Sequence, residues 1–370
     1  MELKMRKITI FTAIILVLLL AVSCGKPSLT PSDTDTGTVS ADGEFVFSER
    51  YDGTLSLFKY NGDDTDVTVP SENEGKKVTA VSSFAFEGKS EILSVTLPDG
   101  ITTVESCAFA TCTALEEINL PESAVFISKE SFEDTAWYSA MPDGFVTVNG
   151  TLLEYKGIGE DVSSVQIPDG TVRIGDRAFY GLSIKSVTIP ESVTSVGERA
   201  FNKCTSLMRI TLPAGINDVG YAAFHDTAWF NLQTGAVVVG DVLVGCKANS
   251  SALSIPSKVR AIAGGAFLGC NAVAISVPEG VVEICDYAFS GCTQIIKINL
   301  PSTVTEIGEH AFDLCPTLMG IDVSNNNDKY MSENGILYGK EDGAELFVPE
   351  GKPAPESEKY DPRDENSSLN

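Results

Sequence analysis

The chain has 370 residues and a formal net charge of −25 at pH 7. A strongly acidic chain lacks the basic footprint that binding to nucleic acid requires, so the charge argues against a nucleic-acid partner. The apolar content of 43% is that of a folded protein, and the length alone would allow two or three ordinary domains. An internal repeat removes that expectation, because a solenoid grows by adding coils and needs no second core.

Residues 1–23 are predicted to be a lipoprotein signal peptide. Lys4, Arg6 and Lys7 form a basic start, and the apolar stretch 8–22 is shorter than a typical membrane-spanning helix. The stretch ends in Ala21-Val22-Ser23-Cys24, which resembles the lipobox of bacterial lipoproteins, in which the cysteine is diacylated and becomes the mature N-terminus. We therefore expect Cys24 to be lipidated. An ordinary secretory signal cleaved nearby is the alternative.

Two segments precede the repeat. Residues 24–42 are rich in Ser, Thr, Asp and Pro, cannot bury a core, and are expected to form a flexible stalk. Within residues 43–77, the runs 45–47 and 54–57 flank Tyr51-Asp52-Gly53, a pattern that predicts a β-hairpin. We expect residues 43–77 to be the N-terminal cap of the solenoid, because an uncapped end coil would expose its core to water.

The repeat itself runs from about residue 78 to residue 323. Its clearest marker is a phenylalanine after Ala or Ser, which recurs every 22 or 23 residues with two longer steps, at Phe86, Phe109, Phe132, Phe179, Phe201, Phe224, Phe267, Phe289 and Phe312. Before each strand-ending proline, alternate residues are aliphatic, as in Val187 and Ile189 before Pro190. This alternation is typical of a half-buried strand. We predict one coil per repeat, with each Phe filling one step of a continuous aromatic stack.

Two insertions break the rhythm at equivalent places, 134–157 and 226–247. Each contains two alternating β-type runs joined by a hairpin dipeptide, Asn149-Gly150 or Gly240-Asp241, and is predicted to be an added hairpin. Trp137 and Trp229 recur at the same place in the insertions, which favours packing onto the coils over ligand binding. Residues 324–350 are expected to form the C-terminal cap, and residues 351–370 a disordered acidic tail.

The pattern Ile-Pro-x-x-Val-x-x-Ile-Gly-x-x-Ala-Phe-x-x-Cys-x-x-Leu, with the Thr-Ala-Trp insertions, resembles the BspA-like leucine-rich repeats of bacterial surface proteins. The likeness covers residues 45 to 350. It implies a mostly β fold, a single solenoid of about ten coils of 22–23 residues with inserted hairpins. It further implies a lipid-anchored protein of the cell envelope, outside the cytoplasm, that adheres to host matrix proteins or other cells. The family fixes no catalytic residue.

The cysteines and histidines are the candidate residues for metal binding, disulfide formation or catalysis. Besides Cys24 the chain has eight cysteines, five of them three residues after a repeat Phe, at Cys112, Cys204, Cys270, Cys292 and Cys315. Equal positions on a ladder do not converge on a metal, and we favour buried free thiols over disulfides. His225 and His310 lie in different coils without a partner motif, and no phosphate-binding loop is present. We therefore expect no metal, no cofactor and no enzymatic activity.

The outward row of the repeat strands, two residues before each proline, is neutral and polar throughout. It consists of Thr96, Asn119, Gln166, Thr188, Thr211, Ser254, Ser276 and Asn299. The row is either a ladder of side chains that hydrogen-bond one another or a face that binds an extended partner. We take it as the candidate ligand-binding face. The expected partner is an extracellular macromolecule, a protein or alternatively a polysaccharide; a passive envelope spacer is the remaining alternative.

Overall fold

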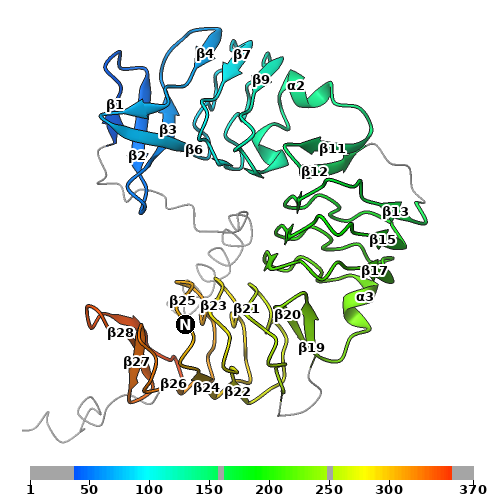
Figure 1. Ribbon diagram of the computed structural model, residues 1–370, viewed down its shortest axis with the longest axis vertical. Helices are drawn as coiled ribbons and strands as arrows, with labels where there is room; N and C mark the ends of the chain where they lie inside the picture. The colour runs from blue at the N-terminus through cyan, green and yellow to red at the C-terminus, as the bar shows by residue number, and fades with distance from the viewer. Residues whose placement is uncertain (1–36, 157–161, 248–252, 352–370) are drawn as a thin grey trace, which may run out of the picture. The chain divides into compact units, whose positions relative to one another are not determined.

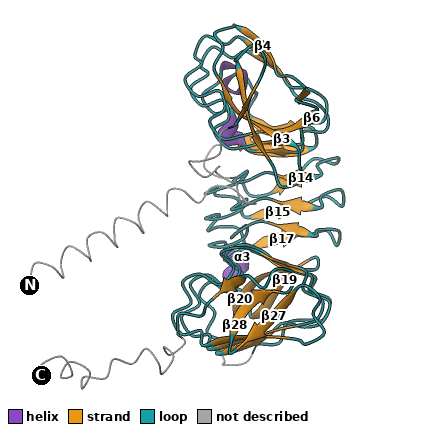
Figure 2. Cartoon of the chain, turned by 90° about the vertical axis from the view of Figure 1, so that its left-hand side faces the viewer, coloured by secondary structure: helices purple, strands orange, loops and turns teal. Residues whose placement is uncertain are grey.

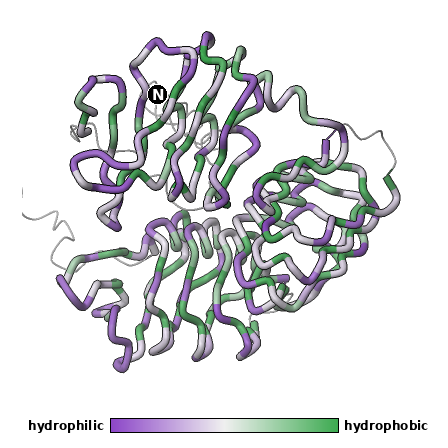
Figure 3. The backbone as a smooth tube through the Cα atoms, turned by 45° about the horizontal axis from the view of Figure 1, so that its top comes forward, coloured by the Kyte–Doolittle hydropathy of each residue, from purple (hydrophilic) through white to green (hydrophobic). Residues whose placement is uncertain are grey.

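The computed structural model describes residues 37–156, 162–247 and 253–351. The predicted signal peptide, Cys24, most of the stalk and the acidic tail lie outside these residues. The chain divides into two compact units, Met1–Leu232 and Gln233–Asn370, which are described separately (Figure 1). Both are built from short strands joined by turns, and Figure 3 shows hydrophobic segments that recur from coil to coil between hydrophilic turns.

The first unit contains two blocks, each a β-hairpin followed by three coils. In the first block, residues 45–140, an antiparallel hairpin leads a sheet in the order β1-β2-β3-β6-β8-β10, with β5 on β6. Its strands are β1 (Thr38–Val39), β2 (Phe45–Glu49), β3 (Leu55–Tyr60), β5 (Glu72–Asn73), β6 (Lys76–Val81), β8 (Thr103–Val104) and β10 (Phe126–Ile127). The coils also form a second, parallel sheet from β4 (Asp66–Thr68), β7 (Ser94–Thr96) and β9 (Glu117–Asn119).

The second block, residues 144–232, repeats this plan. Its hairpin leads the sheet β11-β12-β14-β16-β18, and its second sheet is β13-β15-β17. The strands are β11 (Gly144–Val148), β12 (Thr151–Lys156), β13 (Val165–Gln166), β14 (Arg173–Ile174), β15 (Ser186–Thr188), β16 (Ser195–Val196), β17 (Arg209–Thr211) and β18 (Asp218–Val219). Every pairing after the hairpin is parallel, as expected when successive coils stack in register.

The second unit holds a third block, residues 235–323, and a C-terminal sheet. The two sheets of the block are β19-β20-β21-β23-β25 and β22-β24-β26, and the last sheet is β27-β28-β29. The strands are β19 (Gly235–Val239), β20 (Val242–Lys247), β21 (Ala261–Ile262), β22 (Ala274–Ser276), β23 (Glu283–Ile284), β24 (Lys297–Leu300), β25 (Glu306–Ile307), β26 (Gly320–Val323), β27 (Tyr330–Glu333), β28 (Ile336–Gly339) and β29 (Glu345–Phe347).

The hairpins are the starting element of each block. The predicted hairpins in both insertions are confirmed, and the hairpin expected as an N-terminal cap turns out to be the same element. All three carry a register shift at the same place, after Val46, Val146 and Val237. In each, the second strand pairs in parallel with the first short strand of the coils that follow. A hairpin therefore gives the stack an edge on which the first coil can form.

The phenylalanines form three stacks rather than the continuous one that we predicted. Successive rings lie 4.9 and 5.5 Å apart from Phe86 to Phe132, and 4.9 and 5.5 Å apart from Phe179 to Phe224. In the third block the distances from Phe267 to Phe312 are 4.3 and 5.3 Å. The stack ends at each block boundary because a helix and a hairpin stand there in place of another coil.

Two short helices close the first and second stacks, α2 (Ala136–Ser139) and α3 (Ala228–Asn231). The hydroxyls of Thr135 and Thr227 accept hydrogen bonds from Tyr138 N and Phe230 N and so cap the helices. The tryptophan of each helix then meets the last ring of the stack, at 5.0 Å for Trp137 and 5.4 Å for Trp229. The prediction that these tryptophans pack onto the coils is confirmed. A 3₁₀ helix, η1 (Lys129–Ser131), lies in the last coil of the first block.

The turns between the short strand and the Phe are tight enough to need glycine at some positions. A Cβ on Gly220 would come within 2.5 Å of the backbone nitrogen of Glu198 in the neighbouring coil. The chain also adopts positive φ two residues before and two residues after most of the phenylalanines, as at Arg199 (φ 51°) and Lys203 (φ 61°) around Phe201. These two positions turn the chain sharply on each side of the ring, and their side chains face away from the core.

Candidate binding surface

The predicted outward row is present wherever the repeat strands form. Thr188 on β15 lies in register with Gln166 on β13 and with Thr211 on β17. Figure 2 shows β15 and β17 one above the other. Thr96 is likewise opposite Asn119, and Ser276 opposite Asn299. Their sequence neighbours Val187 and Ile189 are buried, whereas Thr188 is exposed. The alternation that predicted a half-buried strand therefore holds.

Two parts of that prediction need correction. The row is not one continuous face, because the strands belong to three separate three-stranded sheets, β4-β7-β9, β13-β15-β17 and β22-β24-β26. Ser254 is exposed but does not lie in a strand. In the second block the equivalent strand is held by a backbone hydrogen bond from Ile167 N to Thr188 O at 3.0 Å. Between the described parts of the first two coils of the third block there is no such bond, so Ser254 does not join a strand ladder.

The three sheets differ in how far their outward side chains bond one another. In β22-β24-β26, Asn299 Nδ2 donates to Ser276 Oγ at 3.2 Å, and Lys297 pairs with Asp322 at 2.5 Å. In β4-β7-β9 the bond lies in the neighbouring row, where Ser94 Oγ donates to Asp66 Oδ1 at 2.6 Å, and the outward side chains of Thr96 and Asn119 make no hydrogen bond with the described residues. Only the outward row of β22-β24-β26 therefore fits the interpretation of a ladder whose side chains bond one another.

The middle sheet has an unbonded outward row and, in addition, a cation beside it. Within the described residues, the side chains of Gln166, Thr188 and Thr211 have no hydrogen-bond partner, and the guanidinium of Arg209 in the neighbouring row has none either. An amide, two hydroxyls and one cation are thus displayed on β13, β15 and β17 at the spacing of successive strands, about 4.8 Å. This set, Gln166, Thr188, Thr211 and Arg209, is called the β15 face below.

The companion sheet of the second block, β14-β16-β18, carries a row of polar contacts on its outward side. Arg173 Nη1 donates to Ser195 Oγ at 2.6 Å, Arg173 Nη2 pairs with Asp176 at 3.3 Å, and Ser195 Oγ donates to Asp218 Oδ2 at 2.8 Å. Burial raises the pKa of Asp176, and the Arg173 cation and a hydrogen bond from Glu198 N oppose that rise. These contacts join the three coils of the second block.

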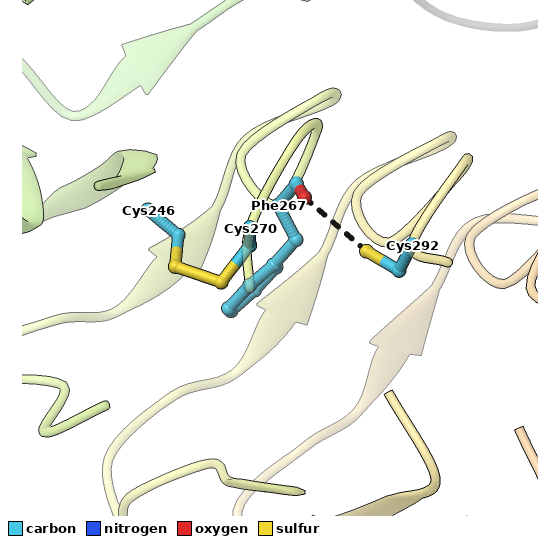
Figure 4. The surroundings of a disulfide bond; sticks show 4 residues. All are labelled: Cys246, Phe267, Cys270 and Cys292. Atoms are coloured by element: carbon cyan, nitrogen blue, oxygen red, sulfur yellow. Dashed lines mark hydrogen bonds between the residues drawn. A yellow bond between two sulfur atoms is a disulfide. The ribbon is translucent and has the colours of Figure 1, made fainter. Parts of the chain in front are cut away.

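The cysteines were only partly predicted. Cys246 and Cys270 form a disulfide, with Cα atoms 5.4 Å apart, so the preference for free thiols over disulfides is wrong for this pair (Figure 4). The reason is that Cys246 lies on the hairpin strand β20 and faces the first coil, outside the Phe-based ladder. The other six described cysteines form no disulfide, and the thiols of Cys112, Cys204, Cys292 and Cys315 donate to the carbonyl of the Phe one coil earlier.

Burial makes two of these ladder thiols, those of Cys112 and Cys204, poor nucleophiles. It raises the pKa of Cys112 to about 11 and that of Cys204 to about 12. His310 Nδ1 lies 2.9 Å from Asp313 and stacks on Tyr287, and His225 packs against Phe230. Across the described ranges no three His, Cys, Asp or Glu side chains gather as a metal site would require, and no helix is long and apolar enough to cross a bilayer.

Sequence reasoning missed one further surface, a pocket of about 590 Å³ at the junction of the first and second blocks. Its basic and aromatic lining includes Arg177, Tyr180, Arg199 and Lys203. Arg177, Arg199 and Lys203 occupy positive-φ positions beside a repeat Phe. The sequence signal that could have revealed this pocket is the presence of basic residues at these positions in the second block alone.

The sequence matches the profile of a known repeat family. The profile described as "BspA type Leucine rich repeat region" matches in 6 copies, over residues 58–142, 158–235 and 243–334. The chain belongs to the BspA type leucine rich repeat family. Its coils, proline-ended strands and buried phenylalanines are therefore those of this family, and the fold predicted from the repeat is confirmed.

Solved structures of similar proteins come from several bacteria. A leucine rich cell surface protein from Faecalibacterium prausnitzii is 25% identical, over 79% of this chain and 96% of that one, with a TM-score of 0.32. The leucine rich repeat protein of T. pallidum is 22% identical, over 52% of this chain and 90% of that one, with a TM-score of 0.32. A leucine-rich repeat protein from Bacteroides ovatus is 21% identical, over 76% and 70%, with a TM-score of 0.30. No curated protein sequence matches the chain.

Proposed function

We propose that this protein is a lipid-anchored cell-surface binding protein that attaches to a macromolecule, in the first place a protein of the host matrix or of another cell, through the β15 face. The observation that carries the proposal is the set of polar side chains without partners on β13, β15 and β17 together with the Arg209 cation beside them. The outward row on β22 and β24 is bonded, and the neighbouring row on β4, β7 and β9 carries no cation. Solenoid sheets are common binding surfaces, and an extended partner can follow a row of strands.

The composition of the β15 face favours a protein partner over a polysaccharide. Gln166 offers both a donor and an acceptor, the two threonines do the same, and Arg209 adds a cation that can pair with a carboxylate. An aromatic platform for sugar rings is not part of this face. Polysaccharide capture remains the second candidate for the molecule as a whole, and a passive spacer the third.

The Cys246–Cys270 disulfide supports the proposed location outside the cytoplasm. A structural disulfide between Cys246 and Cys270 is typical of proteins that fold in an oxidising compartment. The proposed anchor at Cys24 has its own test. A Cys24→Ala variant should leave the membrane fraction and lose the acyl mass at its N-terminus. Retention in the membrane fraction would mean that Cys24 is not the anchor.

The binding proposal is tested with a pair of matched variants. Thr188→Lys with Thr211→Lys alters the β15 face, whereas Thr194→Lys with Asn217→Lys places the same charges on exposed residues of the same coils, beside β16 and β18. Both pairs are expected to change stability by less than about 0.5 kcal/mol, because the sites are exposed. Binding to a panel of immobilised matrix proteins and to a glycan array should fall only in the first variant. Binding that persists in the first variant, or falls equally in both, would exclude the β15 face.

A further inference from the structure

The pocket at the junction of the first and second blocks has the size and the lining of a small-molecule site. Its volume of about 590 Å³ lies in the range of roughly 300–1,000 Å³ that such sites occupy. Lys129 and Glu130 reach it from the first block, Tyr155 from the hairpin strand β12, and Arg177 and Lys203 from the coils of the second block. Three structural elements thus converge on one hollow.

The acidic side chains in the pocket are already matched. Lys129 lies 3.4 Å from Glu133 and 3.2 Å from Glu154, whose other oxygen accepts a hydrogen bond from the Tyr138 hydroxyl at 2.5 Å. Glu130 pairs with Arg177 at 3.3 Å. The lining therefore holds three carboxylates, each with a partner, against four cations.

The cation without a carboxylate is Lys203. Among the described residues no carboxylate lies within ion-pair distance of its ammonium, which is 5.3 Å from the centre of the Tyr180 ring. Tyr180 is 39% exposed, so part of its ring is open to the pocket. The Lys203 ammonium thus lies over the Tyr180 ring with no carboxylate from the described residues beside it, in a chain of net charge −25.

The other two blocks show that the coil does not need these side chains. The positions of Tyr180 and Lys203 are held by Glu87 and Thr111 in the first block, and by Leu268 and Gly291 in the third. The backbone is the same, with φ of 61° at Lys203, 64° at Thr111 and 75° at Gly291. A basic and aromatic pair at these positions is therefore an addition specific to the second block.

The hollow is also filled differently in the other blocks. In the first, Lys89 extends over the ring of Tyr60, at 5.5 Å, and contacts the carbonyl of Gly62 at 2.6 Å. In the third, the Cys246–Cys270 disulfide joins the corresponding hairpin and coil positions. In the second, Leu182 stands at the position of Lys89, and Tyr155 at that of Tyr60. Neither side chain bridges the space, and the pocket remains.

A structural role at the junction accounts for only part of the lining. Lys129–Glu154 and Arg177–Glu130 join the two blocks. Tyr180 and Lys203, in contrast, make no hydrogen bond or ion pair with the described residues of the first block. Their presence is not explained by holding the blocks together.

We propose that this pocket binds an acidic pyranose, a sugar that carries a carboxylate or a sulfate. Arginine and lysine donors pair with such anions, and the open tyrosine ring can pack against the C–H face of the sugar. A neutral sugar would leave the surplus cation unmatched. The site is separate from the β15 face and would let one molecule hold both a protein and an acidic glycan.

The experiment uses the full mature chain and saturation-transfer NMR with glucuronic acid and N-acetylneuraminic acid. Glucose is the comparator, and sodium sulfate, which has no protons to observe, is added as a competitor. The test variant Tyr180→Leu/Lys203→Gly carries the residues of the third block, so its backbone is already compatible. We expect the acidic sugars to bind and the variant to lose affinity at least about tenfold, the equivalent of one lost charge-assisted contact. Lys203→Glu should remove binding altogether.

Controls separate this site from the proposed binding face. The Thr188→Lys/Thr211→Lys variant should bind the acidic sugars as the unaltered protein does, whether or not it still binds a protein partner. Circular dichroism and the melting temperature verify that each variant is folded. The proposal is overturned if glucose binds as well as the acidic sugars, if sodium sulfate displaces the acidic sugars at equal concentration, if none of the sugars binds, or if the folded variants keep full affinity.

Discussion

Phe201→Ala probes the aromatic core at the centre of one stack. The ring of Phe201 is fully buried and lies between Phe179 at 4.9 Å and Phe224 at 5.5 Å, with interplanar angles of 10° and 9°. Removing a buried Phe ring costs about 3–5 kcal/mol in lost transfer energy and cavity formation. Each stacked pair adds roughly 0.5–1.5 kcal/mol beyond its burial. Because both neighbours are stacked, we expect a loss at the upper end, about 5 kcal/mol.

Equilibrium urea unfolding, followed by far-UV circular dichroism, measures this loss. Phe58→Ala serves as the matched control, because Phe58 is 42% exposed and lies on β3 rather than in a stack. It should cost less than about 1 kcal/mol. A loss below about 1 kcal/mol for Phe201→Ala, in a protein expressed at the normal level, would refute the assignment of the ring to the core.

Three further predictions concern other parts of the chain. Asn327, fully buried, donates to Pro301 O and Val304 O at 3.0 and 2.9 Å, so Asn327→Ala should cost about 2–3 kcal/mol and speed hydrogen exchange in the C-terminal sheet; unchanged exchange would contradict this. The raised pKa of Cys112, about 11, leaves only about one part in a thousand of the thiol ionised at pH 8. Iodoacetamide should therefore not label Cys112 until the pH approaches 11. Rapid labelling at pH 8 would count against the burial of this thiol. Reducing Cys246–Cys270, which are separated by 24 residues, should destabilise the third block by about 3 kcal/mol and leave the first unit's unfolding unchanged.

The repeat strand was predictable because its pattern is long enough to read. Val187 and Ile189 alternate with exposed residues before Pro190, and the same alternation recurs in coil after coil. The short strands of the hairpin-led sheet, such as β14, β16 and β18, were not predicted as strand. Ser195–Val196 and its equivalents are two residues long, too short to show any period, and only the neighbouring coils determine that they form a ladder.

The division of the chain into three blocks could be predicted from the sequence only in part. Asn149-Gly150 and Gly240-Asp241 predict the hairpins in the two insertions. The hairpin within residues 43–77 is predicted as a cap because no repeat coil precedes it. The aromatic pair Phe45 and Tyr60 corresponds to Phe145 and Tyr155 in the second hairpin. The third hairpin has Ala236 and Cys246 in place of this aromatic pair. The three hairpins therefore cannot be aligned by their aromatic residues, and the position of Cys246 opposite Cys270 could not be predicted.

The candidate site was predictable as a row and not as a particular face. Sequence spacing placed Thr188 and Ser276 in equivalent outward positions, and both are exposed. Whether such a side chain is free depends on the residues beside it in the next coil. Ser276 accepts a bond from Asn299, whereas Thr188 lies between Gln166 and Thr211 without one. That distinction is a property of side-chain geometry and could not be derived from the pattern.

The most direct test of the central claim is to ask which side of the second block touches the partner. A photo-crosslinking amino acid placed at Thr188 lies on the β15 face, and the same group at Thr194 lies beside β16 in the same coil. After irradiation on the matrix proteins or glycans that the protein binds, the account predicts adducts from position 188 and none from position 194. Adducts from 194 alone, or none from 188 while binding is intact, would contradict it.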